Sequence, residues 1–352
     1  MPVISVINQK GGCGKTTTAV NLSAALAANR KKVLLIDMDS QGHAALALGV
    51  SADHKSTIFD ALDFDIDKPI KDVIVELSSY LHIVPSNIFL CALEQKLAGR
   101  AGREDRLQEK LTKLRRSYDY VIIDCPPSLG LLTINALIAS QKLIVPVDTS
   151  MFSLHGIEKL QETVNMLRSQ LGHRLELFGC ATMFDNRTKY AKVFINKLRE
   201  IFGKNLYQTT IPRTIKLREA VDAGTSIIDY SPASKGAHAY LSLAAEILKI
   251  DQAKTVKLFK SKHRQRDKKE TTFTLSETKA RIVQLAGEFN NWDPARTPLK
   301  EEYKGNWTVA FPLTAGSYQY KYVVDGLWIP DPRNNNVMET ELGGVNSVIV
   351  VN

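Results

Sequence analysis

A glycine- and lysine-rich stretch near the N-terminus has the composition of a phosphate-binding loop. Residues 8–18 read NQKGGCGKTTT and nearly fit the pattern G-x-x-x-x-G-K-[ST], with GKT at the correct end. Gln9 stands where the first glycine belongs, and an additional lysine, Lys10, follows it. In such a loop Lys15 reaches the β- and γ-phosphates of a nucleotide, and the Thr16 hydroxyl coordinates Mg²⁺. We expect a nucleotide to be bound by Gly11, Gly12, Cys13, Gly14, Lys15, Thr16 and Thr17.

Three aspartates follow apolar segments that are typical of strands. Asp37 and Asp39 lie in VLLIDMDSQGH, and Asp124 ends YVIID. Ligands of open α/β sheets bind beyond the carboxyl ends of the strands, so all three carboxylates can face the phosphate loop. We expect Asp37 and Asp124 to help Thr16 hold Mg²⁺, and Asp39 to position the attacking water in hydrolysis. For either aspartate alone, the alternative is a strand-end or helix-capping role.

Two cationic segments could bind polyanions. IPRTIKLREA (211–220) carries Arg213, Lys216 and Arg218, and cations that neutralise phosphates give sequence-independent, salt-sensitive binding to DNA. The alternative is a solvated face or ion pairs between subunits. TVKLFKSKHR (255–264) sets three apolar residues among basic ones, which is a weak membrane anchor. We expect no membrane binding, and we expect this segment to add weak affinity for DNA.

The elements that must position these residues follow an alternating pattern through residues 1–250. Apolar segments at 3–7, 33–37, 81–85, 120–124, 143–147 and 177–183 read as buried strands. Amphipathic stretches such as 16–29, 104–116, 153–171 and 188–202 lie between them. Continuous apolar strands separated by helices predict an α/β domain whose mostly parallel sheet has helices on both faces.

The composition and the apolar pattern of the sequence change twice after residue 250. Residues 251–279 are rich in Lys, Arg and Thr and poor in apolar residues, which predicts a basic flexible linker. Residues 280–352 contain short alternating segments, among them RIVQLAG, NWTVAFPL, SYQYKYVVDG and NSVIVVN, separated by turn-forming pieces. This spacing predicts a small, all-β antiparallel sandwich.

Composition supports this organisation and narrows the function. The 352 residues suit two or three domains, and 44% hydrophobic residues suffice for a buried core. The net charge of +9 divides into +6 for 1–250, +5 for 251–279 and −2 for 280–352, so polyanion binding belongs to the first two parts. No apolar run of about 18 residues or leader pattern is present, and the four cysteines are far apart. We expect a cytoplasmic protein with reduced thiols and no zinc site.

Residues 1–250 resemble the ParA/Soj branch of the ParA/MinD ATPases. The resemblance is carried by KGGCGKTT, DMDSQG, IIDCPP, TMFDNRTKY and TTIPRTIKLREA. It implies an ATPase with slow turnover and with ATP and Mg²⁺ as cofactors. Lys10 would be the signature lysine, which crosses the interface of an ATP-dependent homodimer and contacts the other subunit's phosphates; Lys10, Lys15 and Asp39 would form the catalytic set. Ser40 and His43 depart from the family's DxDPQGN, which leaves the dynamics of this switch segment open.

The same resemblance implies what the ATPase binds. ParA relatives bind DNA non-specifically as ATP dimers, whereas MinD relatives bind membrane. Basic residues in the region of Arg213, Lys216 and Arg218 form part of the DNA surface in ParA-type proteins. We therefore expect association with the nucleoid, with a ParB-like protein as activator. No N-terminal extension offers a helix-turn-helix, so we expect no specific operator recognition.

Residues 280–352 resemble a family-48 carbohydrate-binding module, an immunoglobulin-like early-set sandwich that also occurs in the β-subunit of AMP-activated protein kinase. The resemblance is carried by VQLAGEFNNWDPARTPL, GSYQYKYVVDGLWIPDP and ELGGVNSVIVV. Indoles pack on the apolar faces of sugar rings, while amide and ammonium groups hydrogen-bond their hydroxyls. Trp307 lies within an alternating strand and is expected in the core. The family's α-glucan site matches Trp292, Lys321, Trp328, Leu342 and Asn346.

Together these features predict a ParA-type ATPase that positions glycogen or a related α-glucan over the nucleoid. The main alternative is chromosome or plasmid partition with a ParB-like partner, the C-terminal module serving protein interaction or regulation. A third hypothesis is a regulatory switch whose ATPase responds to glucan without binding DNA.

Overall fold

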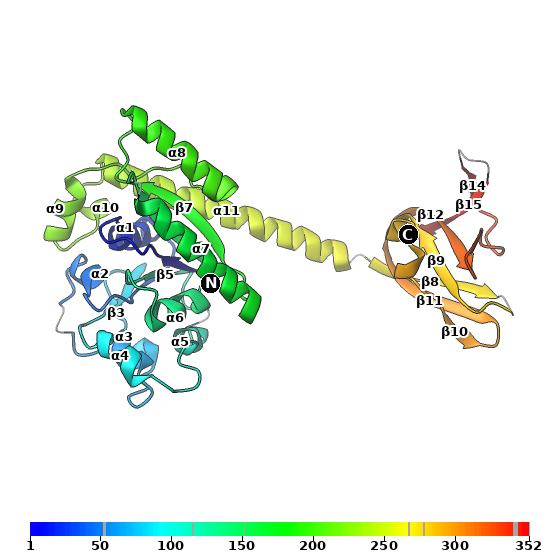
Figure 1. Cartoon of the computed structure of the whole chain (residues 1–352), viewed down its shortest axis with the longest axis horizontal. Helices are drawn as coiled ribbons and strands as arrows, with labels where there is room; N and C mark the ends of the chain where they lie inside the picture. Colours follow the sequence, from blue (N-terminus) through cyan, green and yellow to red (C-terminus); the bar gives the residue numbers. More distant parts are fainter. Residues whose placement is uncertain are drawn as a thin grey trace. The chain divides into compact units, whose positions relative to one another are not determined.

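The computed structural model describes residues 1–51, 54–114, 116–150, 152–266, 268–276, 279–340 and 344–351, with side chains except at 152–155, 170–171 and 255–268. The chain forms two compact units, Met1–Ile250 and Asp251–Asn352 (Figure 1). The first is an α/β domain, and the second is built from antiparallel strands. Among the described residues, no helix is both long and apolar enough to cross a membrane.

A seven-stranded sheet lies at the centre of the first unit, in the order β3-β4-β2-β5-β1-β6-β7. The two-residue β3 (Val75–Glu76) is antiparallel to β4, and the other pairings described are parallel. Each apolar segment predicted as a strand of this domain is a strand in the structure. The parallel strands are β1 (Val3–Val6), β2 (Val33–Asp37), β4 (Leu81–Val84), β5 (Tyr120–Asp124), β6 (Lys142–Asp148) and β7 (Glu176–Thr182).

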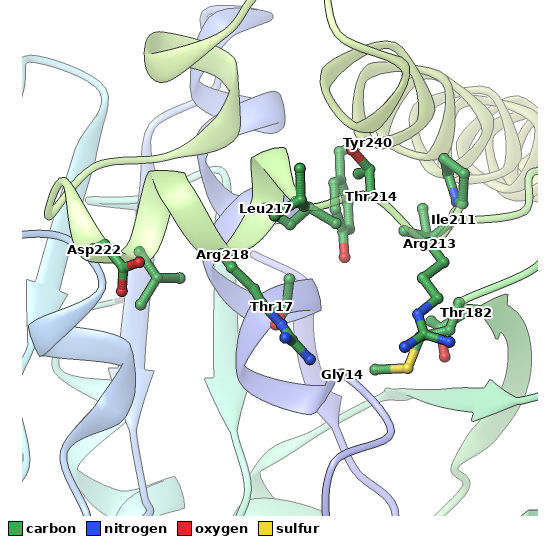
Figure 2. A pocket seen from close by; sticks show the side chains of 14 residues that line it. Gly14, Thr17, Thr182, Ile211, Arg213, Thr214, Leu217, Arg218, Asp222 and Tyr240 are labelled. Carbon is green, nitrogen blue, oxygen red and sulfur yellow. The ribbon is translucent and has the colours of Figure 1, made fainter.

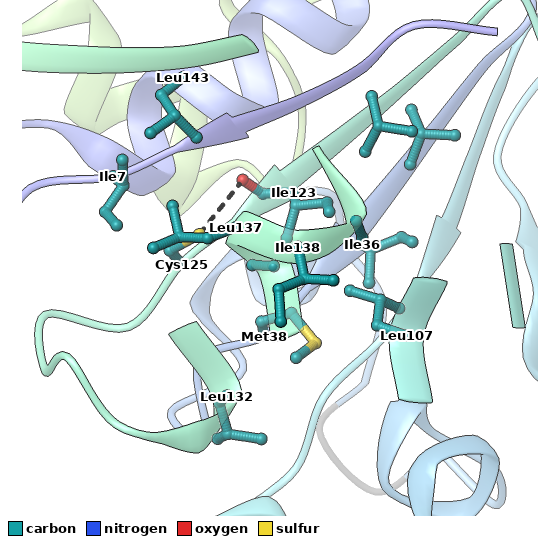
Figure 3. Packing of buried hydrophobic residues seen from close by; sticks show 14 of the residues in the cluster. Ile7, Ile36, Met38, Leu107, Ile123, Cys125, Leu132, Leu137, Ile138 and Leu143 are labelled. Carbon is teal, nitrogen blue, oxygen red and sulfur yellow. Dashed lines mark hydrogen bonds between the residues drawn. The ribbon is translucent and has the colours of Figure 1, made fainter. Parts of the chain in front are cut away.

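Helices cover both faces of this sheet, as the sequence predicts. On β2, Val33 and Leu35 pack with one hydrophobic cluster, whereas Leu34 and Ile36 pack with the other, seen in Figure 3. The alternation explains the continuous apolar strands, because both faces are buried. One face is covered by α1 (Lys15–Ala28), α2 (His43–Leu46), α9 (Lys216–Asp222), α10 (Ile227–Tyr230) and the first part of α11 (Lys235–Arg266), and the other by α3 (Ile58–Leu62), α4 (Leu90–Lys96), α5 (Arg106–Thr112), α6 (Leu131–Ala139), α7 (Phe152–Leu171) and α8 (Lys189–Phe202).

The segment predicted as a flexible linker, 251–279, instead has regular structure over most of its length. α11 continues through Arg266, and β8 (Lys268–Ser276) pairs with β11 (Asn306–Thr314). The prediction failed for β8 because only two of its residues, Phe273 and Leu275, are apolar and buried. They alternate with threonines, so the two-residue period of a strand is weak in the sequence. It failed for the helix because Lys, Arg and Gln are good helix formers even without an apolar stripe.

The second unit is a sandwich of two sheets. One sheet contains β10 (Lys300–Tyr303), β11 and β8; the other contains β13 (Leu327–Ile329), β12 (Gly316–Val324), β15 (Val345–Val351), β14 (Val337–Glu339) and β9 (Val283–Gly287). Its core includes Tyr320, Tyr322 and Trp307. Trp307 is 9% exposed, so its prediction as a core residue is confirmed. Short 3₁₀ turns occur at Ile70–Val73, Gly203–Asn205, Glu288–Asn290 and Pro294–Arg296.

Candidate functional site

The glycine-rich loop after β1 is tied to the neighbouring strands β6 and β7. The Asn8 amide donates to the carbonyl of Pro146 at 2.8 Å, and its oxygen accepts from the backbone N–H of Lys10 at 3.0 Å. The Thr182 hydroxyl at the end of β7 donates to the carbonyl of Cys13 at 2.8 Å. These hydrogen bonds hold the glycine-rich loop in place against strands β6 and β7 of the same chain.

The backbone of the loop is shaped to receive an anion. Gly12 and Gly14 have φ values of +72° and +91°, a region that side chains with a Cβ disfavour. A Cβ at Gly11 or Gly12 would meet nothing within 4 Å, so the space beside the loop is open. Gly14 begins α1 without a side-chain cap, which leaves the first amides of the helix available to a phosphate. The Lys15 ammonium donates to the carbonyl of Lys10 at 3.0 Å.

The additional lysine, Lys10, is held within its own chain. Its ammonium lies 2.5 Å from Asp148 Oδ2 and 2.6 Å from Ser150 Oγ, and the Ser150 hydroxyl donates to Asp148 Oδ1 at 3.0 Å. The side chain of Lys10 is 28% exposed. In this structure Lys10 therefore has its ionic partner in its own chain.

Two of the predicted metal ligands are neighbours at the carboxyl edge of the sheet. Asp37 on β2 lies opposite Asp124 on β5 in the parallel register, and adjacent strands are about 4.8 Å apart. Asp37 accepts backbone N–H bonds from Asp39 and Ala44, each at 3.0 Å. Both carboxylate oxygens of Asp124 are buried and without a hydrogen-bond partner. β5 lies between β1 and β2, so Asp124 also stands next to the phosphate loop.

The electrostatics of this pair fit a cation. Burial raises the pKa of Asp37 to about 7, and burial together with the charge of Asp37 raises the pKa of Asp124 well above its ordinary value. The Thr16 hydroxyl is close enough to lower the pKa of Asp124, although its geometry does not make a hydrogen bond. Oxygen donors of this kind suit Mg²⁺, which takes its remaining ligands from phosphates and water. Among the described residues, no group of three or more His, Cys, Asp or Glu side chains is placed to hold a metal ion.

Asp39, the residue predicted to position water, is half-buried beyond the end of β2. Its Oδ1 accepts the backbone N–H of Gln41 at 3.1 Å. The sequence-based assignment of Asp39 to hydrolysis stays a prediction.

A cavity of about 560 Å³ opens beside the loop (Figure 2). It begins at Gly14 and Thr17 and extends between β7, α9 and α11. Among its lining residues, roles were predicted from the sequence for Gly14, Thr17, Arg213 and Arg218 and for none of the others. A cavity was not predicted here, because the walls come from elements distant in sequence. The lining consists of Gly14, Thr17, Thr182, Met183, Ile211, Pro212, Arg213, Thr214, Ile215, Leu217, Arg218, Val221, Asp222 and Tyr240.

The structure separates the three cations that were predicted to bind DNA. Arg213 and Arg218 line the cavity, whereas Lys216 does not. The Lys216 ammonium forms an ion pair with Glu219 at 2.7 Å and lies 5.9 Å from the centre of the Tyr230 ring. Lys216 is thus ion-paired within its own chain, and its assignment to a DNA surface stays a prediction.

Two indoles of the predicted sugar site lie together on the second unit. The ring centres of Trp292 and Trp328 are 6.3 Å apart at an interplanar angle of 35°, and Trp328 is 46% exposed. Trp292 has a φ of +57°. The loop before it is organised by buried Asn290, whose amide donates to the carbonyl of Leu285 at 2.8 Å. Asn290 is a supporting residue that sequence reasoning did not identify.

Two further members of the predicted site, Lys321 and Asn346, lie on the paired strands β12 and β15. Asn346 donates through Nδ2 to Gln319 Oε1 at 2.9 Å. The register ends at Tyr320 opposite Ser347, which leaves Lys321 next in line to Asn346 on the same face. The structure thus pairs the two indoles with each other and places Lys321 and Asn346 on the neighbouring strands β12 and β15. Leu342 lies outside the described residues.

Comparison with known proteins assigns both units. Residues 1–177 match the protein-family profile described as an AAA domain, and residues 270–352 match that of the glycogen recognition site of AMP-activated protein kinase. The second match begins inside β8, which agrees with the pairing of that strand in the sandwich.

Individual relatives cover the first unit. The chain is 43% identical over 249 residues to the sporulation initiation inhibitor protein Soj of Bacillus subtilis, covering 70% of this chain and 97% of Soj. It is 40% identical over 257 residues to the chromosome partitioning protein ParA of Myxococcus xanthus, covering 72% and 90%. The structure of cobyrinic acid a,c-diamide synthase from Mycobacterium smegmatis with bound ADP and magnesium matches with 32% identity and a TM-score of 0.62, covering 71% and 94%.

We expect Asp124→Asn to raise the melting temperature in EDTA at pH 8 while it abolishes Mg²⁺-dependent ATP hydrolysis. The pKa of Asp124 is raised in the folded protein, so the folded state binds more protons than the unfolded state and loses stability as the pH rises. The gain should therefore shrink between pH 8 and pH 5.5, where protonation removes the same buried charge.

Thermal unfolding with EDTA at the two pH values measures this effect. The exposed Asp72→Asn serves as the matched control, with no pH-dependent change in melting temperature expected. A variant at position 124 that melts below the wild type at pH 8 would contradict the role assigned to burial.

Proposed function

The chain belongs to the ParA/Soj family of partition ATPases and carries a C-terminal glycogen-recognition module, and from this premise we propose that it positions an α-glucan over DNA. ATP with Mg²⁺ is the cofactor of the first unit. In the proposal, ATP holds two chains together, the dimer binds DNA non-specifically, and the second unit captures glycogen or a related glucan. The observation that carries it is the joining of these two units in one polypeptide.

Nucleotide-dependent dimerisation is supported by the placement of Lys10. An ammonium beside the phosphate loop is not needed to hold phosphates where Lys15 already serves, and its contacts with Asp148 and Ser150 leave it near the strand ends. In the proposal, ATP in a partner competes with Asp148 for this charge. Lys10 then stabilises phosphates from across the interface, as a trans-acting cation does in other nucleotide hydrolases.

DNA binding is supported by the family and by the excess of basic residues in the first part of the chain. The proposed contact is sequence-independent and runs through cations such as Lys216. The assignment of Arg213 and Arg218 to the same face stays a prediction from the sequence. A ParB-like activator belongs to this proposal by the same family argument.

Glucan binding is supported by the family match and by the paired indoles. Trp292 and Trp328 offer a sugar ring an apolar surface, and Lys321 and Asn346 offer hydrogen bonds to its hydroxyls. We include Leu342 in the site by resemblance only. Together they suit a glucose polymer, whose rings have apolar faces and polar edges.

Ordinary chromosome partition is the second candidate, and the name of the relative from Myxococcus xanthus, chromosome partitioning protein ParA, favours it. In that case the sandwich would serve protein interaction or regulation. The regulatory switch, in which glucan changes ATP turnover without any binding to DNA, is distinguished by the same experiments.

We expect Lys10→Ala to remain monomeric in the presence of Mg²⁺ and ATP while it still binds nucleotide. The substitution removes the cross-interface charge but leaves Lys15 and the loop amides in place. Light scattering after size exclusion measures the mass, and equilibrium binding measures nucleotide affinity.

Two controls define this result. Lys15→Ala should lose nucleotide affinity itself, and Asp148→Asn, which removes the intrachain partner of Lys10, should dimerise at least as readily as the wild type. An ATP-dependent dimer of Lys10→Ala would refute the role given to this lysine.

We expect Lys216→Ala to lower the salt dependence of DNA binding, reducing the slope of log K against log salt by about one. Each phosphate contact releases counterions, so one lost contact changes the slope without changing sequence preference. Fluorescence anisotropy at several salt concentrations with saturating ATP measures the slope. Glu219→Ala, which frees Lys216 of its ion pair, should bind at least as tightly; an unchanged slope for Lys216→Ala removes this residue from the DNA face.

We expect Trp328→Ala to weaken glycogen binding at least about tenfold, because it removes most of one apolar platform for a sugar ring. Co-sedimentation with glycogen measures binding, and Tyr303→Ala is the matched control, since Tyr303 is an exposed aromatic on the other sheet of the sandwich. In cells, the Trp328 variant should also lose the wild-type distribution of glucan. If the variant did not bind glycogen and the distribution of glucan in cells stayed normal, chromosome partition would become the favoured function.

A further inference from the structure

We infer that Arg213 and Arg218 bind the nucleotide held by the loop of their own chain, and so set its affinity, instead of forming the DNA face. The inference reassigns two residues that the sequence pattern groups with Lys216. It rests on the proposed function only in so far as the glycine-rich loop is the ATP site.

The first support is where the two guanidinium groups lie. Both side chains line the cavity that begins at Gly14 and Thr17. Figure 2 shows the Arg218 side chain running from α9 toward Thr17 and Gly14, and the Arg213 side chain running toward Thr182. The two cations therefore approach the phosphate loop from the side of the cavity.

The second support is electrostatic. The structure records no hydrogen bond or ion pair for either guanidinium among the described residues, although Asp222 lines the same cavity. Lys216, between them in sequence, is paired with Glu219. An arginine stays charged at any ordinary pH, so two unpaired guanidinium groups at one cavity repel each other and favour an anion between them.

The third support is the shape of the lining, which indicates the part of the nucleotide to be bound. Lys15 and the carboxylate pair lie outside the lining, and they are the groups expected at the β- and γ-phosphates and Mg²⁺. The cavity therefore suits the α-phosphate, the ribose and the base. Ile211, Leu217 and Tyr240 give it an apolar wall for a base, and guanidinium forks hydrogen-bond phosphate oxygens or stack on a ring.

This geometry predicts recognition of features that ATP and ADP share. Removing a charge-assisted hydrogen bond to phosphate should weaken nucleotide binding by about tenfold to a hundredfold. We expect Arg218→Ala and Arg213→Ala to raise the Kd for ATP and ADP by similar factors. KM for ATP should rise while kcat at saturating ATP and DNA affinity at saturating ATP stay near the wild-type values.

The experiment measures the Kd for ATP and for ADP by calorimetry, together with DNA anisotropy at saturating ATP, on the full chain. Lys235→Ala is the matched control, because it removes an exposed cation that lines a neighbouring cavity with Arg213 but not this one. It should leave the Kd for both nucleotides unchanged. Arg218→Lys keeps the charge without the fork and should recover part of the affinity, which separates recognition from a folding defect.

The inference is overturned if both arginine variants bind ATP and ADP within twofold of the wild type while their DNA affinity falls. That outcome would return Arg213 and Arg218 to the DNA face. A wild type that does not bind DNA at all would sink the proposed positioning function, yet the nucleotide measurements would still decide the role of the two arginines.

Discussion

Two buried carboxylates that stand side by side, Asp37 and Asp124, set the condition on which the site depends. Taking ionised groups out of water is costly unless an opposite charge accompanies them. The strand order puts β5 between β1 and β2, so the uncompensated charge lies next to the loop that attracts phosphates. A bound Mg²⁺ would satisfy both the carboxylates and the phosphates. The sheet topology therefore places the groups expected to hold the nucleotide and the metal at one edge.

In the proposed dimer, the same edge of the sheet links the bound nucleotide to the pairing of two chains. Lys10 forms an ion pair with Asp148, which ends β6. In the proposal, the Lys10 ammonium leaves Asp148 and contacts a phosphate bound by another chain, so one charge-assisted contact replaces another. The net free energy of pairing the two chains is then a small difference between two large contact energies. Such a balance is readily shifted by the nucleotide bound. A dimer assembled this way would respond to hydrolysis without any large rearrangement of the sheet.

The sequence predicted the sheet and the carboxylate edge because these features are local in pattern. Apolar strands such as Tyr120–Asp124 carry their own signal, and an aspartate at a strand end is placed by topology alone. The cavity beside Gly14 was not predictable, since its walls come from elements distant in sequence such as β7, α9 and α11. The prediction of a flexible linker for 251–279 was wrong because it equated a polar composition with flexibility. Within this segment Phe273 and Leu275 are buried and belong to the strand β8. Charge spacing also does not reveal which cation is paired: Lys216 forms an ion pair with Glu219, whereas Arg213 and Arg218 line the cavity.

In the proposed function, a dimer that binds DNA carries two sandwiches that bind glucan, and this joining gives the protein a property that neither unit has alone. Both proposed ligands are polymers with many equivalent, individually weak sites, and an ATP dimer carries two sandwiches. Linked weak sites gain avidity through effective concentration, so a dimer would hold a glucan particle far more firmly than a monomer does. Nucleotide state would then control attachment to both polymers through one event, the pairing of two chains. The glucan site then needs no direct coupling to the ATP site, because the number of sandwiches in one assembly changes when two chains pair.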